Sequence, residues 1–264
     1  MRIPLFHVDA FTEQPFRGNP AAVCLLNSWL DEGLLRKVAA ENNLSATAFL
    51  VPWNSGYQLR WFTPRCEVKL CGHATLASAH LLLNVRHPDR DSVTFQTKFR
   101  GTLTVRKDGP FLTMDFPAIP TKPCATVPPG LVEASGLESQ PAEVLEGDNA
   151  YLLVSENSEA VRNLRPNFAF LESLHPFVVV VTAQGMDFDF VSRYFAPSYG
   201  IPEDPVTGSA HCALAPYWAN RLGRSKLQAR QLSERGGAVW CEVAGDRVLL
   251  KGKAVITTEG CLSI

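Results

Sequence analysis

A five-residue pattern occurs twice in the chain, and each copy precedes a stretch that opens with glycine and other small residues. Arg60-Trp61-Phe62-Thr63-Pro64 is echoed by Arg193-Tyr194-Phe195-Ala196-Pro197, displaced by 133 positions in a chain of 264 residues. The stretches Gly72-His73-Ala74-Thr75 and Gly208-Ser209-Ala210-His211 follow in the same order. Chance could produce two short matches, but shared order and a near-constant offset favour an internal duplication. The sequence therefore predicts two similar halves, related by a pseudo-twofold axis, whose equivalent elements face each other across a cleft.

Each half is expected to contain short strands and a few helices. Hydrophobic periodicity predicts strands at Ile3–Thr12, Ala21–Leu26, Thr47–Pro52, Gln58–Phe62, Ser92–Thr97, Thr102–Arg106 and Phe111–Phe116. A capping-box pattern at Ser28 predicts a helix that runs to about Asn43, and a second helix is expected from Gly72 to about Val85. The Pro- and Thr-rich segment from Ala118 to about Pro129 is the predicted linker. We therefore expect domains at residues 1–118 and 119–264, with a C-terminal strand near 252–264 packing on the first.

Charge and composition exclude several classes of protein. Lys and Arg number 25 and Asp and Glu 26, so no positive excess exists to neutralise nucleic-acid phosphates. The longest strongly apolar run, Phe177 to Val181, is far shorter than the ~20 residues that span a bilayer. Seven cysteines without C-x-x-C spacing predict reduced thiols, not disulfides or a zinc site. The start of the chain meets charge too early for a secretory signal peptide, so we expect a soluble cytoplasmic protein.

The two glycine-led stretches are predicted to begin central helices that bind an anion. A helix start exposes unpaired N–H groups at the positive end of the helix dipole, which favours negative charge. Gly72 and Gly208 would let a ligand approach the backbone closely. The pair predicts a site for a small carboxylate; the alternative is that both are core helices with ordinary starts.

At these residues the chain resembles a known family. The matching segments are Val8-Asp9-Ala10-Phe11-Thr12, Phe16-Arg17-Gly18-Asn19-Pro20-Ala21, Arg60-Trp61-Phe62-Thr63-Pro64, Cys71-Gly72-His73-Ala74-Thr75, Glu203-Asp204-Pro205-Val206-Thr207-Gly208-Ser209-Ala210 and Gly252-Lys253-Ala254-Val255. They resemble the PhzF family of phenazine biosynthesis-like proteins. The resemblance implies an α+β fold with two pseudo-symmetric diaminopimelate-epimerase-like domains, each an antiparallel sheet wrapped around a central helix. It also implies a homodimeric, cofactor-independent isomerase of a small carboxylic acid, with its active site between the domains.

One position departs from the family pattern. Family enzymes carry a proton-transferring glutamate in an L-S-E-T stretch, and this chain reads Leu44-Ser45-Ala46-Thr47. A methyl group cannot carry a proton, and Glu41 on the preceding helix is a poor substitute. Losing a general acid/base should lower the rate by roughly 10²–10⁴-fold or more. Two explanations for Ala46 stay open: a divergent chemistry, or a deliberate replacement that disables the enzyme.

The resemblance assigns the other site residues. His73 and Asp204 become catalytic candidates, while Ser45, Gly72, Gly208 and Ser209 become substrate-binding candidates. With an ordinary pKa of ~6.5, His73 could relay a proton or hydrogen-bond a substrate oxygen near neutrality. Asp204 could act as a base or orient His73, and the alternative for Asp204, which precedes a proline, is a turn residue.

Cys71 is a possible catalytic thiol. Cys71-Gly72-His73 is similar to the first half of the two-thiol site of diaminopimelate epimerases and proline racemases. The second half reads Val206-Thr207-Gly208-Ser209 where those enzymes carry Cys-Gly-Thr-Gly, and Cys212 lies inside the predicted helix, about one turn further along. We therefore interpret Cys71 as a buried free cysteine.

Two functions from different classes remain. His73 and His80 have no carboxylates at metal-ligand spacing, so no metal site is expected, and the resemblance implies that no other cofactor is needed. The first hypothesis is an isomerase that moves a proton at a carbon next to a carboxylate or a conjugated alkene. The second is a catalytically silent protein that uses the retained site to bind a small acid or a protein partner.

Overall fold

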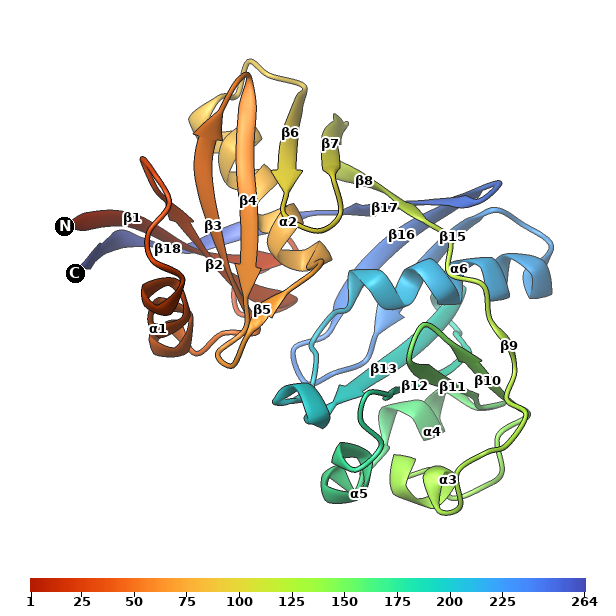
Figure 1. The fold of residues 1–264 in the computed structure, drawn as a ribbon. Helices are drawn as coiled ribbons and strands as arrows, with labels where there is room; N and C mark the ends of the chain where they lie inside the picture. Colours follow the sequence, from red (N-terminus) through yellow and green to blue (C-terminus); the bar gives the residue numbers. More distant parts are fainter. The chain divides into compact units, whose positions relative to one another are not determined.

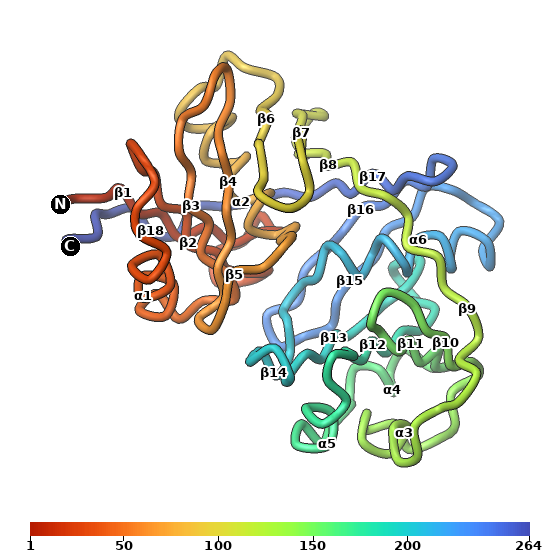
Figure 2. Tube along the Cα trace, viewed as in Figure 1, coloured from red at the N-terminus to blue at the C-terminus, as the bar shows by residue number.

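The computed structural model describes residues 1–264, which form two compact units. Unit 1 comprises Met1–Asp115 and Lys251–Ile264, and unit 2 comprises Phe116–Leu250. The first strand, β1 (Arg2–Ala10), pairs antiparallel with the last, β18 (Ala254–Ser263). The two ends of the chain therefore lie side by side in unit 1 (Figure 2).

Unit 1 is a mixed sheet with two helices (Figure 1). Its other elements are β2 (Asn19–Leu25), α1 (Glu32–Asn42), β3 (Ala46–Trp53), β4 (Gly56–Phe62), β5 (Glu67–Val68), α2 (Gly72–His80), β6 (Ser92–Thr97), β7 (Thr102–Asp108) and β8 (Phe111–Pro117). Paired strands follow the order β18–β1–β2–β3–β4–β6–β7–β8. The β2–β3 and β4–β6 pairs are parallel, and α1 and α2 supply the crossovers that parallel neighbours need.

The two helices of unit 1 cover different faces of its sheet. Leu35 and Val38 of α1 belong to a buried cluster with Phe49 of β3 and Phe62 of β4. Helix α2 contacts β1, β2, β3 and β18, and none of its residues belongs to that cluster. Because strand side chains alternate between faces, α2 covers the face opposite α1. All residues of α2 up to Ala79 are buried, which explains why its sequence is small and apolar on every side.

Unit 2 repeats the plan of unit 1. Its elements are β9 (Lys122–Pro123), α3 (Leu131–Ser135), β10 (Glu143–Gly147), β11 (Ala150–Val154), α4 (Ser158–Arg162), α5 (Phe168–Glu172), β12 (Val178–Gln184), β13 (Phe190–Ala196), β14 (Ile201–Glu203), α6 (Gly208–Leu222), β15 (Lys226–Gln231), β16 (Gly237–Ala244) and β17 (Arg247–Gly252). Paired strands follow the order β9–β10–β11–β12–β13–β15–β16, with β11–β12 and β13–β15 parallel. The sequence of parallel and antiparallel pairs along these strands is the same as along β18–β1–β2–β3–β4–β6–β7 of unit 1. Helix α6 occupies the same place in this order as α2.

The predicted linker segment is an ordered part of unit 2. Pro216 lies inside α6, and because proline has no N–H, the Cys212 carbonyl loses its helical donor. The Ile119 N–H donates to that carbonyl at 2.9 Å instead. The segment also forms β9, which pairs with β10. It therefore packs on its unit and does not act as a free tether.

The α+β class is confirmed, and three local details differ from expectation. Each sheet is mixed, since two of its strand pairs are parallel. Helix α1 is capped by Asp31, whose Oδ1 accepts from the Gly33 N–H at 2.8 Å, and not by Ser28. Beyond His80, α2 continues as a π-helical turn, Leu81–Arg86. Strand boundaries agree with the periodicity to within a few residues, and β6 agrees at both ends.

Candidate functional site

The start of α2 in unit 1 brings together Cys71, Gly72 and His73. Cys71 is in an extended conformation at the N-cap and its side chain does not cap the helix. The Thr75 hydroxyl donates to the Cys71 carbonyl at 2.7 Å and fixes this junction. The first-turn N–H groups therefore lie at the positive end of the helix dipole without a capping side chain from Cys71.

His73 is a buried, neutral imidazole. The residue is 6% exposed, and the Cys71 sulfur lies 3.5 Å from Nδ1 and 3.8 Å from Nε2. Burial lowers the pKa of His73 from 6.5 to about 3, because the imidazolium would lose its hydration. The ordinary pKa near 6.5 assumed from the sequence therefore does not hold for this buried ring, whereas a hydrogen bond from His73 to a substrate oxygen stays a prediction. At physiological pH the ring offers one N–H donor and one acceptor nitrogen.

Ala46 begins β3 and is buried, and Ser45 precedes it at a half-buried position. Phe49 of the same strand faces α1, so by alternation the Ala46 methyl lies on the sheet face that α2 covers. Its neighbour across the parallel pair is Ala21, another small side chain. Position 46 thus shares the α2 face of the sheet with the helix that carries His73, but it carries no group able to transfer a proton.

In unit 2, Asp204 lies in the loop between β14 and α6. It is 8% exposed, and its Oδ2 accepts a hydrogen bond from the Thr207 hydroxyl at 2.5 Å. The Asp204 N–H donates to the Tyr194 carbonyl at 3.0 Å, which ties the loop to β13. The fully buried side chain of Gln231, at the end of β15, bonds to the same loop. This aspartate is held by side chains, and not only by the turn geometry of the following proline.

The first turn of α6 separates exposed from buried groups. Gly208 is buried, whereas Ser209, at the second helical position, is an exposed residue. His211 Nδ1 donates to the Thr207 carbonyl at 2.8 Å, since that carbonyl is only an acceptor. Burial lowers the pKa of His211 to about 4 and raises that of Cys212 to about 12. Cys212 is therefore not a thiolate, which argues against a two-thiol racemase.

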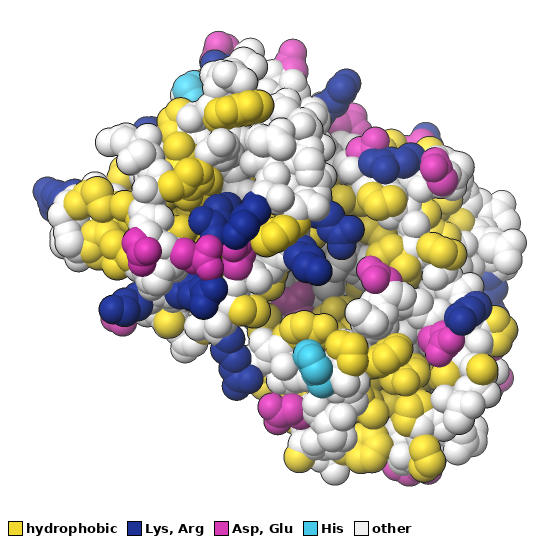
Figure 3. All heavy atoms as spheres, viewed as in Figure 1, with side chains coloured by type: hydrophobic (Ala, Val, Ile, Leu, Met, Phe, Trp, Pro, Cys, Tyr) yellow, Lys and Arg dark blue, Asp and Glu magenta, His cyan; other side chains and the backbone are white.

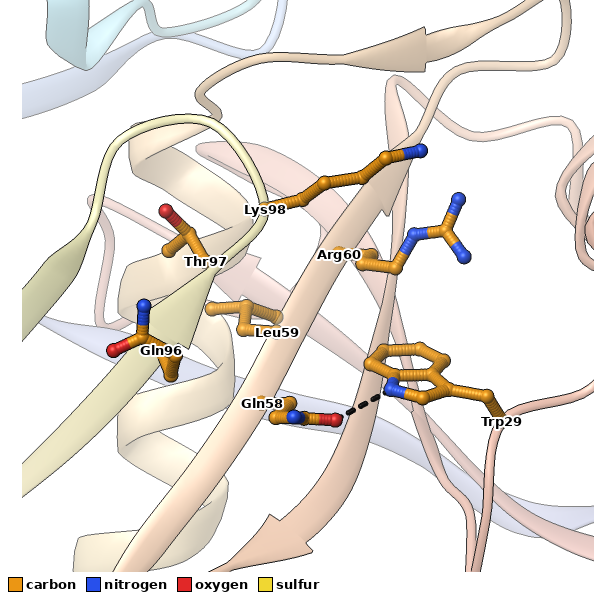
Figure 4. A pocket seen from close by; sticks show the side chains of 7 residues that line it. All are labelled: Trp29, Gln58, Leu59, Arg60, Gln96, Thr97 and Lys98. Atoms are coloured by element: carbon orange, nitrogen blue, oxygen red, sulfur yellow. Dashed lines mark hydrogen bonds between the residues drawn. The ribbon is translucent and has the colours of Figure 1, made fainter.

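A groove of about 280 Å³ lies on the α1 side of unit 1, away from these residues. Figure 4 shows the Arg60 guanidinium between Lys98 and Trp29, with Gln58 bonded to the Trp29 indole. Arg60 pairs with Glu67 and with Glu32, and Lys98 pairs with Glu67 at 3.0 Å. Basic and acidic side chains accordingly lie next to one another on this unit (Figure 3). Because Arg60 and Lys98 already have carboxylate partners, we interpret the side chains of this groove as a structural ion-pair network and not as a ligand site.

No group of three or more His, Cys, Asp or Glu side chains is placed to hold a metal ion. No helix has both the length and the apolar character needed to cross a membrane.

The family model of the phenazine biosynthesis-like proteins, PhzC-PhzF, matches residues 8–260. The chain belongs to this family. A relative from Pseudomonas aeruginosa, named an uncharacterized isomerase, is 50% identical over 264 residues, which cover 100% of both chains. The crystal structure of a PhzF-family protein from Enterococcus faecalis is 41% identical and superposes with a TM-score of 0.93 over 100% of both chains.

The fold extends beyond the PhzF family. A hydroxyproline epimerase from Agrobacterium vitis shares it with a TM-score of 0.63 and 11% identity, over 99% of this chain and 92% of that one. At this identity the likeness shows the fold alone. The epimerase-like α+β fold expected from the sequence is thus the fold of this chain.

Sequence reasoning missed three residues that hold the PhzF motif of unit 2. Thr207 stands inside the quoted motif, but nothing in a linear pattern shows that its hydroxyl points at Asp204. His211 follows the motif directly and bonds back to it. Gln231 lies 27 positions from Asp204 and belongs to no motif, so only the parallel β13–β15 pairing reveals it.

Proposed function

We propose that the chain is a cofactor-independent isomerase, at least by descent, that moves a proton on a small carboxylate-bearing metabolite. The observation that carries this proposal is the full-length match to a relative that bears the name isomerase at 50% identity. The chemistry of the described residues supports it, because His73 and Asp204 are buried groups able to exchange protons or hydrogen bonds. The proposal includes a homodimer and a cytoplasmic location.

Each residue receives a role that its surroundings support. The neutral imidazole of His73 would hydrogen-bond a substrate oxygen, because its lowered pKa disfavours the imidazolium. Asp204 would be one of two proton-transferring groups, with an acidic side chain at position 46 as the other: one takes the proton from the carbon and the other returns a proton at another position, so that substrate and product differ only in where that proton is bonded. Backbone N–H groups after Gly72 and Gly208, with the hydroxyl of the exposed residue Ser209, would bind the carboxylate. Ser45 beside Ala46 is the remaining binding candidate.

A catalytically silent binding protein is the second candidate, and Ala46 is the observation that favours it. Its methyl group is 1% exposed, at the position where the resemblance places the acid/base. The binding residues Gly72, Gly208 and Ser209 would then retain a small acid without turnover. A protein partner is the other ligand that such a retained site could serve.

The test is deuterium uptake, followed by NMR, into a broad pool of small carboxylic acids in heavy water. We expect Ala46→Glu to increase uptake by roughly 10²-fold or more over the unaltered chain. Ala46→Gln is the matched control, because it has the size of the glutamate variant and cannot transfer a proton. Uptake by the glutamate variant alone supports the isomerase and identifies the substrate class.

Other outcomes point elsewhere. Equal uptake by the unaltered chain would show that Cys71, His73 or Asp204 completes the transfer without an acidic side chain at position 46. Folded but inactive Ala46→Glu, with acid binding that Ser209→Ala weakens, would replace the isomerase with the binding protein. Absence of both uptake and small-acid binding would leave a protein partner as the ligand.

A further inference from the structure

We infer that Gln231 is a positioning residue for Asp204 and acts through the hydroxyl of Thr207. The inference rests on the proposed function, in which Asp204 transfers the proton. The Gln231 side chain is fully buried and lies at the end of β15, beside Ser192 of β13. Its amide spans the loop that carries Asp204: Oε1 accepts from the Thr207 N–H at 2.9 Å, and Nε2 donates to the Asp204 carbonyl at 2.5 Å.

The orientation of this amide is forced by its partners. The Thr207 N–H can only donate and the Asp204 carbonyl can only accept. A flipped amide would place its two donor hydrogens against an N–H and its oxygen against a carbonyl, and would leave both buried backbone groups unsatisfied. Each unsatisfied group would cost about 1–3 kcal/mol. Nε2 therefore lies next to the loop carbonyl, and its second hydrogen is available to the Thr207 hydroxyl, 3.3 Å away.

That second contact fixes the direction of the Thr207 hydroxyl. Nε2 of Gln231 is only a donor, so the Thr207 oxygen accepts from it and must direct its own hydrogen elsewhere. The Asp204 Oδ2 lies 2.5 Å away and receives that hydrogen. Amide, hydroxyl and carboxylate form a chain in one direction, and a hydroxyl donor favours the charged form of a carboxylate.

His211 holds the third polar group of Thr207. Its Nδ1–H donates to the Thr207 carbonyl at 2.8 Å. The N–H, the hydroxyl and the carbonyl of this one residue are therefore all bonded to side chains, from β15, the loop and α6. We call these three bonds the Thr207 clamp. The clamp is more than loop closure requires, because the backbone bond from Asp204 to Tyr194 already ties the loop to β13. What the clamp adds is a hydroxyl donor with a fixed direction toward the Asp204 carboxylate.

The experiment follows the titration of Asp204 by NMR in the full chain labelled with carbon-13 at aspartate carboxyls, with Asp204→Asn to identify the signal. Thr207→Val removes the hydroxyl but keeps the side-chain shape and the N–H to Gln231. We expect it to raise the Asp204 titration midpoint by about one pH unit, since one charge-assisted hydrogen bond is lost. Thr207→Ser keeps the hydroxyl and should leave the midpoint in place. An unchanged midpoint in Thr207→Val would overturn the inference.

The role of Gln231 is read in the unaltered protein, which avoids any variant that fails to fold. Its side-chain amide nitrogen should respond with the same midpoint as the Asp204 carboxyl, because the hydroxyl couples them. This response should disappear in Thr207→Val. If the chemical shift of the Gln231 side-chain amide does not change as Asp204 titrates, Gln231 only holds the loop in place, and the inference would be overturned.

A kinetic measurement separates this inference from the proposed function. In an Ala46→Glu background that exchanges deuterium, Thr207→Val should lower kcat and change KM little. The acid limb of the pH–rate profile should shift to higher pH by the same amount as the NMR midpoint. A profile that does not move would overturn the positioning role. If Ala46→Glu shows no exchange with any acid, the proposed function fails, while the two NMR titrations still decide whether the clamp sets the state of Asp204.

Discussion

Arg60 donates from Nε and Nη2 to both carboxylate oxygens of Glu67, at 2.6 and 2.7 Å. Arg193 makes the same two-pronged contact with Glu203, at 2.7 and 2.8 Å. Each guanidinium also lies over the phenylalanine two positions further on, 5.1 Å from the ring centre in both units. The duplicated sequence pattern therefore encodes a duplicated ion pair that joins a long strand to the short strand before a central helix.

We expect this pair to stabilise both units to a similar degree. Glu67→Gln or Glu203→Gln should each lower the free energy of unfolding by about 1–3 kcal/mol, because a charge-assisted, two-pronged contact is weakened at a largely buried site. Urea unfolding gives the measurement. Glu159→Gln is the control, since its contact with Arg162 is solvent-exposed and should contribute less than about 0.5 kcal/mol. Equal losses in all three variants would show that the paired geometry adds nothing.

Three histidines should make the protein less stable as the pH falls below 6.5. Burial lowers the pKa of His73 to about 3, and those of His80 and His211 to about 4. Between these values and 6.5 the unfolded chain binds protons that the folded chain does not, so their contribution is complete above pH 6.5 and is lost on acidification.

His211→Gln tests this pH dependence, because glutamine keeps a donor for Thr207 and does not titrate. The free energy of unfolding, measured with urea, should fall less between pH 7.5 and pH 5 in this variant than in the unaltered chain. The difference should correspond to the one proton that His211 binds in the unfolded chain only. An identical pH dependence in both proteins would mean that His211 binds protons equally in the folded and unfolded chains, which would contradict its lowered pKa.

Gly18, in the motif after β1, should tolerate no side chain. It has φ +65°, and a Cβ there would meet the Ala10 carbonyl oxygen and the Thr12 side chain. Gly101 has the same φ but open space around it, so it is the matched control. Gly101→Ala should cost about 1–2 kcal/mol for its backbone conformation alone, and Gly18→Ala roughly 1–3 kcal/mol more for the clash. Similar thermal unfolding of the two variants would contradict a close approach at Gly18.

The repeat and the strands were predictable because they depend on local patterns. Alternation of apolar residues predicted β6 at both ends, and the spaced copies of the Arg60 pattern predicted two similar units. The parallel pairs were not predictable, because pairing across a helical crossover leaves no mark in the strands themselves. The expectation of purely antiparallel sheets did not take into account the crossovers through α2 and α6. Because of these crossovers, β6 runs parallel to β4 and β15 runs parallel to β13.

The site was predictable only where its residues share a motif. Cys71, Gly72 and His73 are consecutive, so their common helix start could be read from the sequence. The state of His73 could not, because its low pKa is set by burial among residues distant in the chain. The contacts of Gln231 with the Asp204 loop could not be predicted for the same reason. They form only because β15, the strand that follows α6, ends beside that loop.

Thiol reactivity should sort the cysteines by burial. Cys24, Cys212 and Cys241 are buried, and burial raises the pKa of each, to about 12 for Cys24 and Cys212. Cys66 and Cys261 are exposed. A thiol reacts as its thiolate, so an alkylating reagent at pH 8 should modify Cys66 and Cys261 within minutes and leave the three buried thiols intact until the chain unfolds. Peptide mass spectrometry after timed alkylation gives the order. Rapid native-state modification of Cys212 would contradict its buried, protonated state and would reopen a two-thiol mechanism; its protection leaves the proton transfer to other groups.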